Sequence, residues 1–263
     1  MKNIIRSIAY ELLRSRLMVY VFILITISNA LIAILNIEDN SFHEATGSAM
    51  IAEANSLTFL FAEFFVIFAV GVICGSDLTD KVANYEILSG HSRRRVYLAR
   101  SIFGVLLASV LGLVLSLIPM AAGTAIFGWG HRLVFRDVLI RHLLYVFPFL
   151  RIAAFTVILT FLIKNQYAVM GIGYGIVTFN TIASGMVAER ANLLTANFNL
   201  NLLSAFEGWR VYNLSAADGI VYYATYDSGL SAEAIAGTIL LSIALAAVYL
   251  LIGYALFQRD DLN

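Results

Sequence analysis

The chain has 263 residues, of which 60% are hydrophobic and only 13% are charged. Soluble domains have roughly 45–50% apolar and about 25% charged residues, so this composition excludes an ordinary soluble domain and indicates an integral membrane protein. The 17 basic and 17 acidic residues balance, which gives no indication of a nucleic-acid partner, and the single cysteine, Cys74, excludes an internal disulfide. Because no linker-like stretch divides the sequence, we expect one membrane domain over residues 1–263.

Residues 1–16, "MKNIIRSIAYELLRSR", place apolar side chains at helical spacing on one face. This pattern predicts a basic amphipathic helix that lies in the inner membrane interface before the first span. An ordinary polar lead-in is the alternative interpretation. The apolar face consists of Ile4, Ile5, Ile8, Leu12 and Leu13, and the charged remainder consists of Lys2, Arg6 and Arg14.

Six later segments are long and apolar enough to cross a membrane, which requires about 20 residues. The first follows a basic stretch, but it is longer than the ~7–15 apolar residues of a signal peptide, so we expect it to be retained. The sequence therefore predicts an all-α fold with six transmembrane helices. They cover approximately residues 18–37, 57–75, 101–127, 139–163, 168–187 and 234–257.

The basic residues that flank these spans are distributed unequally between the two sides. Short cytoplasmic flanks carry the excess of Lys and Arg, so both termini are expected in the cytoplasm. The richer side has Lys2, Arg6, Arg14, Arg16, Lys81, Arg93, Arg94, Arg95, Arg100, Lys164 and Arg259, and the poorer side has Arg132, Arg136, Arg141, Arg190 and Arg210.

The loop after the second span, residues 76–100, has the pattern of a helix, a turn and a second helix. Ser76 can cap the first helix, whose first turn contains Asp77 and Asp80, where the helix dipole favours anions. "SGHS" at 89–92 ends it, and Arg93 begins the run that enters the third span. An apolar stripe on the first helix requires a partner, either lipid or another protein. This stripe consists of Leu78, Val82, Tyr85 and Leu88.

Residues 188–233 form the longest segment on the outer side. The stretch "NLLTANFNLNLLSAF" is apolar but too polar to span, and several aromatic residues follow it. Because amphipathic rings favour the headgroup level, we expect short interfacial or re-entrant helices here. The aromatic residues are Trp209, Tyr212, Tyr222, Tyr223 and Tyr226.

Two ionisable residues lie inside predicted spans, and intramembrane charges are functional candidates by default. Glu63 lies in the second span and Arg151 in the fourth, at similar intermediate depth on the outer side. They are candidates for an ion pair, within one subunit or across a dimer. The alternative is that each reaches water or a polar cavity independently.

Small residues in two spans predict close helix packing rather than nucleotide binding. The sequence contains no G-x-x-x-x-G-K-[ST] phosphate loop, and its densest glycines, in "GIGYGIV", fall inside the fifth span. The four histidines show no metal-ligand spacing, so we expect no metal site, and no nucleophile–base pair is evident. The packing candidates are Gly104 and Gly112 in the third span and Gly171 and Gly175 in the fifth.

The loop and the C-terminus resemble the permease subunits of ABC exporters of the second type, the ABC-2 superfamily. The resemblance extends over essentially the whole chain, including the closing "FQRDDLN", which is similar to the family's Phe…Arg-Asp motif at Phe257, Arg259 and Asp260. The loop is its most specific part, with Arg100 in place of the usual lysine. The matching loop residues are Asp77, Lys81, Glu86, Leu88, Ser89, Gly90, Ser92, Arg93, Tyr97 and Leu98.

The resemblance implies that the loop after the second span is a coupling helix, which docks on a separate ATP-binding subunit. It implies a dimer of permease subunits, homomeric or heteromeric, in a bacterial plasma membrane. ATP and Mg²⁺ would bind the partner, so this chain would be neither the catalyst nor a cofactor-binding chain. The coupling residues would be Asp77, Leu78, Lys81, Val82, Tyr85, Glu86, Leu88 and Arg93.

The expected function is therefore export of an amphipathic substrate, such as a bacteriocin or other peptide, a drug or a lipid. The short outer loops favour peptide export or immunity to an antimicrobial peptide. A membrane-embedded enzyme or sensor without an ATPase is the alternative function. Co-purification of an ATP-binding subunit would discriminate between the two.

Overall fold

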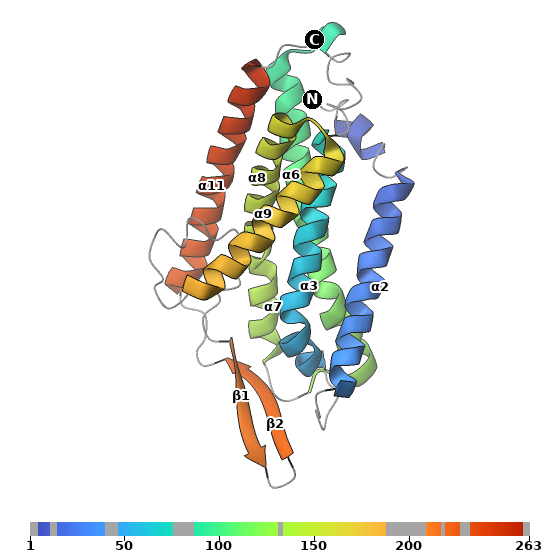
Figure 1. Cartoon of the computed structure of the whole chain (residues 1–263), viewed down its shortest axis with the longest axis vertical. Helices are drawn as coiled ribbons and strands as arrows, with labels where there is room; N and C mark the ends of the chain where they lie inside the picture. The colour runs from blue at the N-terminus through green and yellow to red at the C-terminus, as the bar shows by residue number, and fades with distance from the viewer. Residues whose placement is uncertain are drawn as a thin grey trace.

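The computed structural model describes residues 5–10, 15–39, 47–75, 87–130, 134–187, 209–216, 219–226 and 232–259. These residues form a bundle of long helices with one β-hairpin at an end (Figure 1). Residues 5–10 are helical, and this segment and the end of the last helix lie at the same end of the bundle (Figure 1). The long helices are α2 (Arg16–Asp39), α3 (Gly47–Val70), α6 (Arg93–Phe127), α8 (Val146–Ile163), α9 (Gln166–Val187) and α11 (Ala232–Arg259).

Three helical stretches of the described residues are long and apolar enough to cross a membrane: Arg93–Phe127, Val138–Ile163 and Ile235–Arg259. Two shorter apolar stretches are Arg16–Leu31 and Leu60–Gly75. These stretches are compatible with a membrane protein. The helices occupy all six predicted segments, but a count of six spans remains a prediction.

The core of the bundle lies where α3 packs against α2 and α6, and where α8 packs between α6 and α11. Gly112 allows the closest approach of α6, because a Cβ there would lie 2.5 Å from Val66 Cγ2 and 3.3 Å from Phe149 Cδ2. Helices that lack a side chain at the crossing point can bring their backbones close together. One glycine on α6 thus joins α3 and α8.

Local sequence explains where two helices break. The predicted span 139–163 divides into α7 (Phe135–Leu144) and α8, with Tyr145 between them. Pro148 has no N–H and disfavours a continuous helix, but it is tolerated in the first turn of α8. Lys164 then ends α8 in the left-handed conformation, with φ 55°, and the Asn165 side chain accepts hydrogen bonds from two backbone N–H groups of α9.

Helix α6 begins well before the predicted third span. Gly90, with φ 97°, lies in the turn that precedes it, and Ser92 is extended, so the helix starts at Arg93 as the "SGHS" break predicts. Its 35 residues measure about 52 Å at ~1.5 Å per residue, which exceeds the ~30 Å hydrocarbon layer. One end of α6 therefore projects beyond the apolar region.

The prediction of short helices over residues 188–233 is wrong for 209–216 and 219–226, which are strands. The strands β1 (Trp209–Ala216) and β2 (Gly219–Tyr226) pair as an antiparallel hairpin at the end of the bundle opposite the N-terminal segment (Figure 1). The aromatic residues that suggested a membrane interface also favour strands, as do β-branched residues such as Val211 and Val221. Two such runs separated by two residues are a hairpin signal. Residues 188–208 lie outside the described residues.

Candidate functional site

One link between distant parts of the sequence lies where α6 begins and α11 ends. Four aromatic rings meet there, and we call them the helix-end cluster: Tyr97, Phe161, Tyr254 and Phe257. The Tyr97 ring centroid is 5.4 Å from that of Phe161, 5.3 Å from that of Tyr254 and 5.7 Å from that of Phe257. The cluster therefore joins α6, α8 and α11 by rings in the spacing that aromatic pairs favour.

Hydrogen bonds reinforce this junction. The Tyr97 hydroxyl donates to the Leu250 carbonyl oxygen at 2.5 Å, and Arg93 Nη1 donates to the Gln258 carbonyl oxygen at 3.3 Å. The last carbonyls of a helix lack intrahelical partners, so Arg93 satisfies one of them at the end of α11. The start of α6 is thereby attached to the end of α11 at two levels.

The element directly before the predicted coupling segment is a π-helix, η1 (Gly71–Gly75), which continues α3. Its residues are mostly buried: a Cβ on Gly71 would lie 3.3 Å from Met170, and a Cβ on Gly75 would lie 3.3 Å from Gln166, both on α9. The Cys74 thiol lies 3.8 Å from the Arg100 carbonyl oxygen of α6. π-Helical turns occur frequently at functional sites.

Most of the predicted coupling residues lie outside the described residues: Asp77, Leu78, Lys81, Val82, Tyr85 and Glu86. Leu88 is described and is 80% exposed, and Arg93 is bound to α11 as above. The structure therefore fixes both flanks of the segment, at Gly75 and at Ile87, but not the predicted helix between them.

A second region contains two ionisable side chains that are almost fully buried. Glu63 is 1% exposed and Arg151 is 0% exposed, so both side chains are removed from solvent. Glu63 interacts electrostatically with Arg151, and Arg151 also interacts with Tyr249 of α11. The three residues, which we call the buried charge cluster, come from α3, α8 and α11. Sequence reasoning identified the two charged residues but missed Tyr249, whose only signal was a polar ring tip inside an apolar span.

Other buried polar side chains fall into two groups. Several hydroxyls are satisfied within their own helix: Ser109 donates to the Val105 carbonyl oxygen and Thr156 to that of Ile152. Others have no hydrogen-bond partner among the described residues, namely the Asn29 amide, the Glu63 Oε2 atom and the Ser242 hydroxyl. Sequence reasoning did not identify Asn29 or Ser242.

The four predicted packing glycines have different surroundings. Gly104 lies against η1, where a Cβ would be 3.1 Å from Ile73 Cγ2, and Gly112 lies in the crossing described above. For Gly171 and Gly175, no atom of the described residues lies within 4 Å of a Cβ position. The close approach on α9 is instead at Gly173, where a Cβ would lie 3.0 Å from Ile67 Cγ2.

The described residues contain no group of three or more His, Cys, Asp or Glu side chains that could hold a metal ion. Cys74 is buried.

No known protein-family model matches the sequence, and no curated protein matches it significantly.

Proposed function

We propose that this chain is the transmembrane subunit of an ATP-driven exporter of the ABC-2 type. One observation carries the proposal: two of the short sequence segments that resemble this family, at 93–98 and 257–259, lie far apart in the chain but meet in the helix-end cluster. Arg93 and Tyr97 of the first segment contact Gln258 and Phe257 of the second. Both segments therefore contribute to the same contact, which holds the start of α6 against the end of α11.

The location of this junction supports a coupling role. The segment between Gly75 and Ile87 begins and ends beside α6, because η1 contacts α6 through Cys74 and Gly104. A force applied to that segment by a partner would therefore reach α6 directly, and through the helix-end cluster it would reach α11. The exposed Leu88 offers apolar surface for such a partner.

In this proposal a separate chain binds and hydrolyses ATP, and two permease subunits form the translocation path in a bacterial plasma membrane. With six spans both termini lie on one side, and the concentration of basic residues there makes it the cytoplasmic side in this proposal. The exported species is amphipathic, such as an antimicrobial peptide, a drug or a lipid. The buried charge cluster is then an internal feature of the permease rather than a catalytic centre.

The test is purification of the tagged chain from its native host in mild detergent, followed by identification of bound ATP-binding subunits and measurement of ATP hydrolysis. We expect an ATPase subunit to co-purify. Leu88→Glu should weaken its retention, because it places a charge on the proposed apolar contact. Val134→Glu is the matched control. Val134 is also exposed, but it lies directly before α7 and follows the C-terminal end of α6, whereas Leu88 precedes the N-terminal end.

Two results would contradict the proposal. One is a stable, folded chain that retains no ATP-binding subunit, which would favour the membrane enzyme or sensor. The other is equal retention by the Leu88 and Val134 variants together with unchanged ATP hydrolysis, which would contradict the proposed contact of the ATPase with the surface at Leu88.

A further inference from the structure

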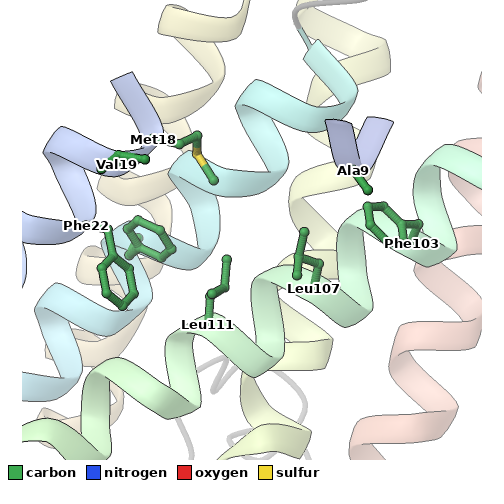
Figure 2. A pocket seen from close by; sticks show the side chains of 8 residues that line it. Ala9, Met18, Val19, Phe22, Phe103, Leu107 and Leu111 are labelled. Carbon is green, nitrogen blue, oxygen red and sulfur yellow. The ribbon is translucent and has the colours of Figure 1, made fainter. Parts of the chain in front are cut away.

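An apolar groove of about 390 Å³ lies between α2 and α6 and is floored by α3. Pockets that hold drug-sized ligands have volumes of about 300–1,000 Å³, so the groove has room for a ligand. Figure 2 shows side chains from α2 and α6 facing each other across it, with Ala9 of the N-terminal helical segment at one end. Its lining residues are Ala9, Met18, Val19, Phe22, Phe65, Phe103, Leu107 and Leu111.

The length of the groove matches one leaflet of a bilayer. Phe103, Leu107 and Leu111 form one wall at spacings of four residues on α6, which corresponds to about 12 Å at ~1.5 Å per residue. One leaflet contributes about 15 Å of the ~30 Å hydrocarbon layer. The wall therefore runs along most of the depth that an acyl chain occupies.

The groove opens between apolar surfaces that face outward. On α2, Leu17 and Tyr20 are 46% and 65% exposed, and on α6, Leu106 and Val110 are 51% and 50% exposed. Residues of this kind on both sides of the opening indicate that the groove faces lipid rather than the bundle interior. At its floor, the Phe65 ring lies 5.4 Å from the Phe22 ring in an edge-to-face arrangement.

Positive charge is concentrated at one end of the groove. Arg16 precedes Met18 by two residues, Arg6 precedes Ala9 by three, and both arginines are exposed. Arg94 and Arg95, at the start of α6, lie toward the same end and are also exposed. Among the described residues at this end of the bundle there is no Asp or Glu.

We propose that the groove binds one acyl chain of an anionic phospholipid, whose phosphate lies against Arg6 and Arg16. Apolar walls of leaflet length provide the site for the chain, and the arginines provide favourable charge for the headgroup. The proposal requires the membrane placement of the chain described above, but not an ATPase partner or coupling. A neutral phospholipid and the apolar tail of an exported substrate are the competing occupants.

The test compares lipid retention by the full chain after purification from mixed vesicles of phosphatidylglycerol and phosphatidylcholine, with bound lipid measured by mass spectrometry. We expect selective retention of phosphatidylglycerol. Replacement of one arginine, as Arg16→Gln, should lower its retention about fivefold, because a basic residue near an anionic surface contributes ~1 kcal/mol. Leu107→Trp should reduce retention of both lipids by filling the groove.

Leu240→Trp is the control, because Leu240 is 67% exposed on α11, which contributes no residue to the groove. Unchanged elution and unfolding temperature in lipid-free detergent establish that each variant is folded. If Leu107→Trp does not fold, Leu107→Phe and the wild-type selectivity still test the site. Equal retention of both lipids overturns the anionic assignment, and full retention by Leu107→Trp and Leu107→Phe overturns the groove as the binding site. Equal retention of both lipids by a wild-type chain that also co-purifies with an ATPase would refute this inference and leave the proposed function intact.

Discussion

Removing either charge of the buried charge cluster should destabilise the fold far more than removing both. Glu63→Gln keeps the size of the side chain but leaves Arg151 buried beside a neutral group, and Arg151→Met leaves Glu63 in the same position. Because both residues are at most 1% exposed, the ~0–1 kcal/mol of a surface pair does not apply, and the ~3–5 kcal/mol found for breaking a hydrogen-bonded buried pair is the upper bound.

A double-mutant cycle measures whether the two charges act together. Independent sites would make the double variant about 6 kcal/mol less stable than the wild type, from ~3 kcal/mol for each single change. If the charges compensate each other, the double variant should lose only about 2 kcal/mol or less, since it buries no net charge. Tyr249→Phe keeps the ring and removes only the hydroxyl, so we expect it to lose less stability than either single charge variant.

The assay is reversible unfolding of the purified chain in mixed detergent micelles with increasing dodecyl sulfate, followed by circular dichroism. Export or immunity measured in cells provides an independent readout. Additive losses in stability would refute a shared interaction and would mean that Glu63 and Arg151 are satisfied separately. If neither single variant changed the free energy of unfolding, the expectation that burial makes these charges important for stability would be refuted.

Three further predictions follow from the packing and the topology. Gly112→Ala should destabilise the chain by about 1–3 kcal/mol in the same unfolding assay, because its Cβ would overlap a valine of α3, whereas Gly171→Ala should be neutral or stabilising because no described atom lies nearby. Tyr97→Phe should lose about 0.5–1.5 kcal/mol in chemical denaturation, because it removes one hydrogen bond and keeps the ring. Tags at Met1 and Asn263 should both resist labelling from outside intact cells, and labelling of either end would contradict the predicted topology.

The sequence predicted the positions of the helices well because their signal is local. A long apolar run and a Gly-containing break are each detectable within a few residues, as the start of α6 at Arg93 after "SGHS" illustrates. The hairpin at 209–226 was missed because aromatic residues suit both a membrane interface and a strand. The signals that could have identified it were two runs rich in aromatic and β-branched residues, separated by two residues.

Contacts between distant segments could be predicted only in part. Glu63 and Arg151 were recognised because a charge inside an apolar run is conspicuous, but Tyr249 is ordinary in such a run. Similarly, three glycines alternate at 171, 173 and 175, and only the orientation of α9 against α3 selects Gly173 for the close contact. Small residues in the sequence identify a helix that can pack closely. Which of these residues makes the contact depends on how the neighbouring helices are arranged.

The position of α6 connects the two candidate regions. Its first turns hold Arg93 and Tyr97 in the helix-end junction, and near its middle Gly112 contacts Val66 and Phe149. Val66 is three residues from Glu63, and Phe149 is two residues from Arg151. Helix α6 has no break between Arg93 and Gly112. A displacement of its first turn would therefore be transmitted along the helix to the contacts at Gly112. The proposed coupling of ATP use to transport would therefore require α3 and α8 to move together with α6, or the Gly112 crossing to separate.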